Sequence, residues 1–220
     1  MQHDFITTLD DFGLSPHYDE KIISTANKEK INRVSILPHL YDIRYALPWL
    51  QSIPARDIHL TATEQKIRQK QYPPNSISRR AYFILKTSTS GIDWVEREWE
   101  NQIKEFIALF GSAPDGINSH EHIHFYPPLF KRACNLAEKY NIPFIRLGTN
   151  ITHQDRSIRG ALYNRFHPKN IKHLGNTQCI TSTALYSADG HFGEEIASLL
   201  PANTEVIVHP DIKNDWHLIT

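Results

Sequence analysis

The chain has 220 residues, 40% of them hydrophobic, which is enough for one large domain and short for two. Its 24 Lys and Arg residues balance 24 Asp and Glu residues, so it lacks the basic field that a nucleic-acid backbone or an anionic membrane would need. The sequence therefore predicts a single domain over residues 1–220 that binds neither partner. Its 13 histidines are unusual and favour metal binding or a titrating site.

The two cysteines, Cys134 and Cys179, lie far apart and form no C-x-x-C pattern. This excludes a disulfide scaffold and a cysteine zinc site. The N-terminal residues carry neither a basic region nor a long apolar stretch, so we expect no signal peptide. No segment approaches the ~18 apolar residues of a membrane span. These features predict a soluble, cytoplasmic protein, and the balanced charge with a few candidate exposed aromatic residues permits a homodimer.

Short β-like segments alternate with amphipathic helical segments in the first half of the chain. The predicted strands are Phe5–Leu9, Val34–Leu37 and Ile58–Thr61. An Asp-Asp-Phe-Gly turn follows the first strand, and Ser15 with Pro16 predicts the cap and first residue of a helix that reaches about Ile31. Residues 62–92 are rich in polar and basic side chains, and we expect an excursion over the strand ends that is helical near Arg80–Leu85.

The clearest helix of the second half is predicted over Asp93–Phe110, where apolar residues recur at spacings of three and four and Gly111 ends the helix. A second helix is predicted over Leu129–Tyr140. The predicted strands are Ile117–His124, Phe144–Leu147 and Val206–Val208, with weaker candidates at Ile171–Leu174 and Gln178–Thr181. This alternation predicts an α/β fold with a parallel sheet or barrel, whose active site lies at the C-terminal ends of the strands.

Two adjacent carboxylates, Asp10 and Asp11, directly follow the first predicted strand, and Gly13 permits a tight turn there. Neighbouring carboxylates repel each other, so one is raised in pKa unless a cation neutralises the pair. A metal ion resolves the conflict if one carboxylate ligates it and the other accepts a proton from water. The alternative is a helix N-cap with a neighbouring acid, which is the favoured interpretation for the pair taken alone.

The sequence His120-Glu121-His122-Ile123-His124 is more specific. On a strand, alternate residues share one face at a spacing of about 6.6 Å, so all three imidazoles would point the same way. Three such histidines are either exposed, in a polar cavity, or at a metal site. Neutral imidazole is a common ligand of divalent metals, so we favour the metal site, although the spacing does not say which histidine binds.

Single residues at other predicted strand ends are each weak evidence for a functional site, but their common position at the strand ends strengthens that evidence. His59 alone is most often a satisfied or surface histidine, and His209 can donate a proton to a leaving group if its pKa lies near the working pH. All the candidates lie at or near the ends where a barrel assembles its active site; they are Asp10, Asp11, His59, His120, Arg146 and His209.

Several of these motifs resemble the YdjC-like carbohydrate deacetylases, the family that includes chitooligosaccharide deacetylase. The resemblance covers nearly the whole chain, and its most specific parts are the Asp-Asp-Phe-Gly turn and the H-x-H-x-H segment. The matching segments are Leu9–Ser15, Ile58–Thr61, Glu98–Gly111, Asn118–His124, Arg146 and His209–Pro210. The resemblance implies an irregular (β/α) barrel of the TIM-like type, with the architecture of glycoside hydrolases and deacetylases.

The resemblance also implies an activity, namely metal-dependent hydrolysis of N-acetyl groups on amino-sugar oligosaccharides. One divalent ion, zinc or magnesium, would be held by Asp11, His59 and His120. Asp10 would be the general base, His209 the general acid, and Arg146 the residue that orients the catalytic carboxylate. His122, His124 and Phe12 would line the substrate site.

The chain departs from the family pattern at three places. Asn118 stands where aspartate is usual, Thr8-Leu9 replaces Asn-Ala, and the chain ends soon after His209. Two alternatives stay open, and these departures favour the first of them. One is a degenerate, non-catalytic sugar-binding relative, and the other is a metallo-amidohydrolase or phosphoesterase with a different substrate, which would hold more than one metal ion.

Overall fold

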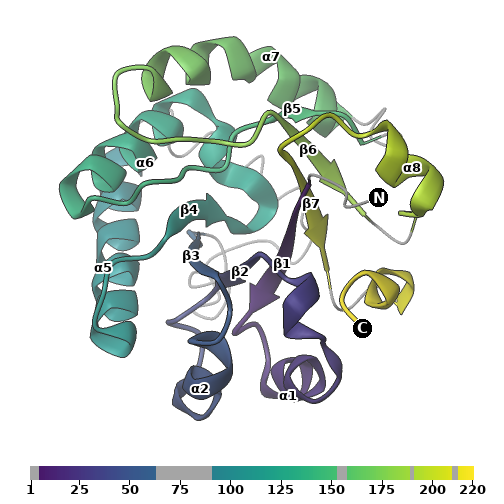
Figure 1. Ribbon diagram of the computed structural model, residues 1–220. Coiled ribbons are helices and arrows are strands. Elements are labelled where there is room, and N and C mark those ends of the chain that lie inside the picture. The colour runs from purple at the N-terminus through teal and green to yellow at the C-terminus, as the bar shows by residue number, and fades with distance from the viewer. Residues whose placement is uncertain (1–4, 63–90, 153–157, 189–190, 210–212) are drawn as a thin grey trace.

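Seven parallel strands form one sheet in the order β4-β3-β2-β1-β7-β6-β5. The computed structural model describes residues 5–62, 91–152, 158–188, 191–209 and 213–220. The strands are β1 (Ile6–Phe12), β2 (Arg33–Ile36), β3 (Ala55–Leu60), β4 (Gly116–Ser119), β5 (Thr149–Asn150), β6 (Ala184–Ser187) and β7 (Thr204–Val208). The sheet curls into an irregular barrel of the TIM-like type, as predicted (Figure 1).

The ring of strands continues past β4 through isolated parallel bridges. Ile117 on β4 bridges to Ile145, and Phe144 bridges to Ile180. The N–H of Arg146 donates to the carbonyl of Ile117 at 2.9 Å, which extends the same pattern by one residue. The predicted strand at Phe144–Leu147 is therefore a bridging segment rather than a full strand, and it places Arg146 beside β4.

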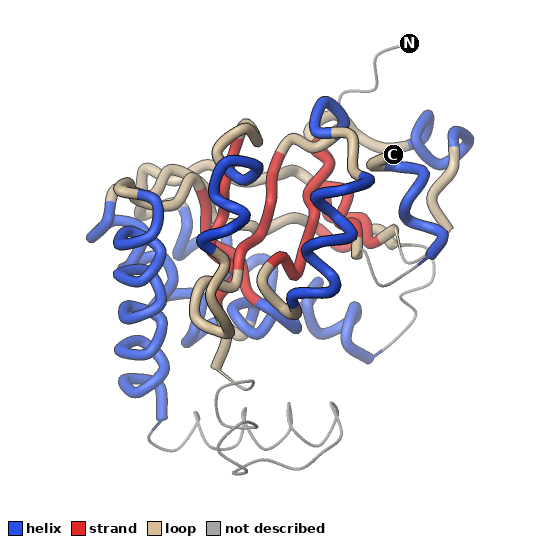
Figure 2. The backbone as a smooth tube through the Cα atoms, turned by 90° about the horizontal axis from the view of Figure 1, so that it is seen from below, coloured by secondary structure: helices blue, strands red, loops and turns tan. Residues whose placement is uncertain are grey.

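Helices surround the strands on the outside of the curled sheet (Figures 1 and 2). They are α1 (Pro16–Thr25), α2 (Leu47–Leu50), α5 (Ile92–Phe110), α6 (Pro127–Tyr140), α7 (Ile158–Leu174) and α8 (Glu194–Leu199). The apolar stripe of α5 is buried, and Gly111 ends that helix with a left-handed φ of 72°. The predicted helices at Asp93–Phe110 and Leu129–Tyr140 are confirmed within two residues.

The two faces of the strands differ in polarity. Apolar side chains on the outer face pack against the helices, which bury residues such as Ile22, Trp49 and Trp99. The inner face instead carries polar and charged side chains, all of them buried except the partly exposed Arg33, whereas branched apolar residues dominate the interior of most barrels of this type. The inward-facing residues are Thr8, Asp10, Arg33, Ser35, Asp57, His59, Asn118 and Glu205.

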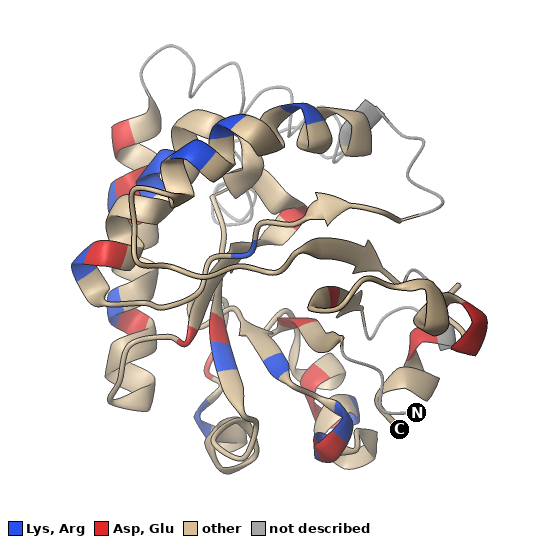
Figure 3. Cartoon of the chain, turned by 45° about the horizontal axis from the view of Figure 1, so that its top comes forward, with Lys and Arg blue, Asp and Glu red and all other residues tan. Residues whose placement is uncertain are grey.

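The outer helices carry charges of both signs. Figure 3 shows basic and acidic residues mixed along α5 and α6. Arg132 on α6 pairs with Asp93 and Glu96 on α5, and Lys139 pairs with Glu100. Among the described residues, no helix combines the length and apolarity needed to cross a membrane.

Several local predictions were wrong. The helix predicted to reach Ile31 ends at Thr25, and Ile171–Leu174 is the end of α7 rather than a strand. Residues 178–181 contribute only the bridge at Ile180. Strand β6 and helix α8 were not predicted, because both are too short to show a periodic apolar pattern. The expected helix near Arg80–Leu85 lies outside the described residues.

Candidate metal centre

Asp10 and Asp11 lie in a β-bulge at the end of β1. Adjacent residues of a regular strand point to opposite faces of the sheet. Here the pairing register with β2 shifts between Leu9 and Phe12, so that β1 contains one residue more than β2 over this stretch. Asp11 has a left-handed φ of 67°. The bulge explains how two consecutive carboxylates both reach buried groups inside the barrel.

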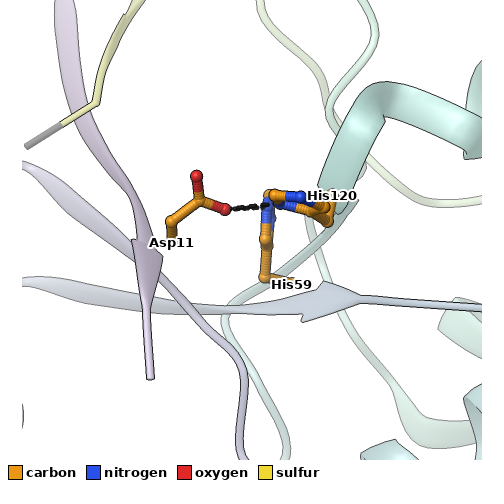
Figure 4. A group of neighbouring side chains, drawn as sticks. All are labelled: Asp11, His59 and His120. Carbon is orange, nitrogen blue, oxygen red and sulfur yellow. Dashed lines mark hydrogen bonds and ion pairs between the residues drawn. The ribbon is translucent and has the colours of Figure 1, made fainter. Parts of the chain in front are cut away.

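Asp11, His59 and His120 converge although they come from three separate parts of the chain (Figure 4). Asp11 Oδ1 lies 2.6 Å from His120 Nδ1 and 3.1 Å from His59 Nε2. One ligand atom from each residue lies within 4.8 Å of the other two. The structure thus brings together all three residues that the resemblance implies as metal ligands.

The chemistry of these three side chains fits a divalent cation. Burial would raise the pKa of Asp11, but His120 and His59 hold it well below its ordinary value, so the group is a carboxylate anion. His59 Nε2 is buried and faces the Asp11 carboxylate, with Oδ1 at 3.1 Å. One carboxylate and two imidazoles are ligands that zinc accepts, and three protein ligands leave a coordination position open.

Asp10 is held by Arg146 in a bidentate ion pair. The two guanidinium N–H groups donate to its two carboxylate oxygens, each at 2.8 Å, and Ser35 Oγ donates to Oδ1 at 2.6 Å. Burial would raise the pKa of Asp10, but the charge of Arg146, with those of His59 and His209, holds it well below its ordinary value. Asp10 is therefore an oriented anion beside the Asp11 cluster.

Glu205 on β7 is a further buried acid that the sequence analysis did not single out. Arg146 Nε donates to Glu205 Oε1 at 2.9 Å, and Thr8 Oγ1 donates to the same oxygen at 2.8 Å. Arg146 thus spans the barrel interior between two carboxylates, and it is fully buried itself. A charged residue directly before the buried apolar residues Val206–Val208 was the available signal for Glu205.

The predicted strand of three histidines is wrong. Strand β4 ends at Ser119, and His120–Phe125 forms a 3-10 turn in which Glu121 and His122 have positive φ. The three imidazoles consequently do not share a face. Of the three, only His120 reaches Asp11. The turn therefore identifies His120 as the candidate ligand, which the spacing of the histidines alone did not.

His124 and Phe12 are buried rather than open to a substrate. The carbonyl of Arg146 lies 3.0 Å from His124 Nε2, and Ser119 Oγ lies 2.6 Å from Nδ1. Burial, opposed by that contact with the Arg146 carbonyl, lowers the pKa of His124 to about 3, so the ring is neutral. Phe12 stacks on Trp49 in the core. His122 is partly exposed and stacks on Phe125, which leaves it as the most accessible of the three predicted substrate contacts.

His209 follows β7 on the strand next to β1. Val208 pairs with Leu9, which brings the following residues, His209 and Asp10, to neighbouring positions at the same end of the barrel. The N–H of His209 donates to Asp215 at 3.3 Å, and Asp215 is fully buried. The structure therefore brings His209 to the acid cluster, as the strand-end argument predicts.

The fold and the site define the class of protein. It is an α/β barrel in which carboxylates and imidazoles gather at the C-terminal ends of the strands. Within that class, the chain belongs to the family described as "YdjC-like protein", whose family model matches residues 5–219.

Named relatives of the chain are moderately similar. A "Carbohydrate deacetylase" of Halalkalibacterium halodurans is 28% identical over 151 residues, which cover 65% of this chain and 63% of that protein. A "Chitooligosaccharide deacetylase" of Proteus mirabilis is 25% identical over 151 residues, which cover 65% of this chain and 58% of that protein. The chain thus spans about three fifths of the length of these curated relatives.

A solved structure shares the fold. It is a crystal structure of an Enterococcus faecalis protein provisionally described as a cellobiose-phosphate cleavage protein. The TM-score is 0.60 at 20% sequence identity, and the match covers 93% of this chain and 80% of that one. The match shows that the two chains share their fold.

Proposed function

We propose that the protein is a metal-dependent hydrolase that removes N-acetyl groups from amino-sugar oligosaccharides. One observation carries the proposal: the Arg146-held carboxylate of Asp10 lies beside the Asp11, His59 and His120 cluster at the same end of the barrel. The names of the relatives, carbohydrate deacetylase and chitooligosaccharide deacetylase, support the same chemistry.

Asp11, His59 and His120 would hold one divalent ion. Such an ion supplies Lewis acidity, which polarises a carbonyl and makes water more acidic. Zinc fits the two imidazoles well, and magnesium is the alternative that carboxylate ligation permits.

Asp10 acts in this proposal as the general base. Its Oδ1 accepts from Ser35 and Arg146, whereas Oδ2, among the described residues, accepts from Arg146 alone. A carboxylate oxygen has two lone pairs, so Oδ2 keeps one with which to take a proton from the attacking water. Arg146 keeps the group ionised and fixes its direction.

His209 acts as the general acid. Its position beside Asp10 at the end of β7 allows it to deliver a proton to the amine nitrogen as the C–N bond breaks. His122 is partly exposed and lies two residues after the proposed ligand His120, and we assign it to the sugar-binding surface.

Acetate release tests the proposal. Protein treated with a chelator to remove bound metal is incubated with N,N′-diacetylchitobiose and longer chitooligosaccharides, and zinc or magnesium is then added back. We expect metal-dependent release that falls by about 10²–10⁴-fold in Asp10→Asn, the range for loss of a general base. Asp42→Asn, an exposed substitution of the same kind, should retain full activity.

Each alternative gives a different result. Binding of the oligosaccharide with no release under any metal would establish a sugar-binding relative instead. More than one tightly bound ion per chain would favour a phosphoesterase or another amidohydrolase. Loss of the metal in Asp10→Asn would overturn the assignment of Asp10 as the base.

A further inference from the structure

A chain of short hydrogen bonds connects His59 to Asp10 across four neighbouring strands. Asn118 Oδ1 lies 2.5 Å from His59 Nδ1, and Asn118 Nδ2 donates to Ser35 Oγ at 2.8 Å. Ser35 Oγ in turn donates to Asp10 Oδ1 at 2.6 Å. All four side chains are at most 1% exposed, so water does not compete for these bonds.

The register of the sheet creates this chain. His59 on β3 is paired directly with Asn118 on β4. Ser35 lies on β2, between β3 and β1, and its side chain points to the inside of the barrel as theirs do. The contact between His59 and Asn118 therefore follows from strand pairing and does not depend on a flexible loop.

The donors and acceptors permit one arrangement of protons. Asp10 accepts two guanidinium bonds from Arg146, so it is an anion that can only accept. Ser35 has a single hydrogen, which goes to Asp10, and its oxygen must then accept from Asn118. The amide N–H₂ of Asn118 consequently faces Ser35, and its carbonyl oxygen faces His59. His59 must therefore donate from Nδ1. In the neutral ring, this leaves the lone pair of Nε2 on the side of Asp11.

We propose that Asn118 is a positioning residue that holds His59 in the Nδ1–H tautomer and at the same time keeps the Ser35 hydroxyl on Asp10. The same amide thus presents the histidine nitrogen that would bind a metal ion and orients the base. The tautomer assignment stands without the reaction, and only the consequence for Asp10 rests on the proposed function.

Aspartate at position 118 would perform one half of this task. A carboxylate accepts the Nδ1–H of His59 as well as an amide oxygen does, but it has no hydrogen to donate to Ser35. The Ser35 hydroxyl would then be shared between two carboxylates, and Asp10 would lose part of its donor. Asparagine joins the two halves because it is an acceptor at one end and a donor at the other.

The first test reads the tautomer directly. The full-length, metal-free protein with ¹⁵N-labelled histidine is studied by long-range ¹H–¹⁵N correlation at a pH where the imidazoles are neutral, and His59→Gln assigns the signals. We expect protonated Nδ1 and unprotonated Nε2 for His59. Protonation at Nε2 instead of Nδ1 would overturn the proposal, and this measurement needs no substrate.

The second test measures zinc affinity by chelator competition. Asn118→Ala should weaken binding by about 10–100-fold, as expected for loss of the partner that orients a ligand histidine. Asn170→Ala is the matched control, because Asn170 is also fully buried and donates to a carbonyl, that of Phe125 at 2.9 Å. Equal affinities in these two variants would contradict the proposal.

Asn118→Asp separates the two halves. This variant should keep the tautomer and the zinc affinity of the wild type but lower kcat, because Ser35 is no longer held on Asp10 alone. A loss of zinc affinity equal to that of Asn118→Ala would contradict the proposal. If acetate release is absent in the wild type while the tautomer and zinc results hold, the proposed function fails and the role of Asn118 toward His59 remains.

Discussion

The outer and inner faces of the barrel strands are built from the same segments but have different roles. On the outside, alternate residues such as Leu9 and Ile58 pack against helices and supply the apolar area that drives folding. On the inside, the residues between them form a buried network of ions and hydrogen bonds around Arg146. Because strand residues alternate in direction, one short sequence can specify a core and a site together.

This difference suggests that the two faces can be perturbed separately. A buried ion pair contributes little net stability but is costly to break by removing one partner, whereas an apolar contact contributes in proportion to its area. The following predictions test the separation, from the largest expected effect to the smallest.

His124 should make the metal-free protein sensitive to acid. Its pKa is about 3 in the folded protein and 6.5 when unfolded, so the unfolded chain binds more protons between these values. The free energy of unfolding should therefore fall as pH decreases below 6.5, by about 1.4 kcal/mol per pH unit and about 5 kcal/mol by pH 3.

The measurement is urea unfolding between pH 7.5 and 4 in the presence of chelator. His124→Gln should be less stable at pH 7.5 but should lose less stability on acidification than the wild type. His17→Gln, at an exposed position of α1, should leave the slope unchanged. Equal slopes for wild type and His124→Gln would show that another group controls acid unfolding.

Arg146→Met and Trp99→Ala should cost similar stability but differ in function. Removal of Arg146 leaves Asp10 and Glu205 buried without a counter-charge, a loss of about 3–5 kcal/mol. Removal of Trp99, which is fully buried on α5, leaves a cavity at a cost of about 3–5 kcal/mol. Chemical denaturation gives both values.

The rate of acetate release, measured at a temperature where both variants are folded, then distinguishes the role of the outer face from that of the inner face. Trp99→Ala should keep most of the activity, because it lies on the outer side of the sheet. Arg146→Met should lose it, because Asp10 is no longer oriented. Equal activity losses would mean that packing on the outer face controls the geometry of the site.

The outer face is also what made the fold predictable from sequence. The apolar residues of β2, β3 and β7 and the apolar stripe of α5 repeat with the period of a strand or a helix, and their positions were predicted nearly correctly. Segments without such a stripe were predicted less well. Strand β5, which has two residues, was missed. The segment at Phe144–Leu147 was predicted as a strand, but it hydrogen bonds through its backbone without forming a regular one.

The inner face was predictable only in part. The residue types of the metal cluster and their place at strand ends were visible, but the bulge that turns both Asp10 and Asp11 inward was not. The H-x-H-x-H alternation suggested a strand, whereas left-handed Glu121 and His122 end it. Glu205 was missed because its partner, Arg146, is 59 residues away in the chain, and spacing within a motif shows only local geometry.

Asp19 gives the smallest predicted effect, and its sign is opposite to that of His124. It is buried in α1, and its carboxylate accepts the N–H of Gly13 at 3.0 and 3.1 Å and the hydroxyl of Tyr41. It thereby supports the turn after Asp11. This turn requires glycine at position 13, because a Cβ there would lie 2.5 Å from the carbonyl oxygen of Leu37. Burial raises the pKa of Asp19 from 3.8 to about 6, despite the opposing bonds from Tyr41 and Gly13.

The folded protein therefore binds more protons than the unfolded chain between pH 3.8 and 6, and Asp19 lowers stability as pH rises through this window, by about 3 kcal/mol in total. Asp19→Asn should remove this penalty, so its stability relative to the wild type should increase from pH 4 to pH 7. Glu20→Gln, its exposed neighbour, is the control. Urea unfolding of the metal-free proteins measures the difference in stability. If the stability of Asp19→Asn relative to the wild type decreases from pH 4 to pH 7, Asp19 is ionised in the folded state throughout this interval and acts as a structural anion beneath the turn that carries Asp11.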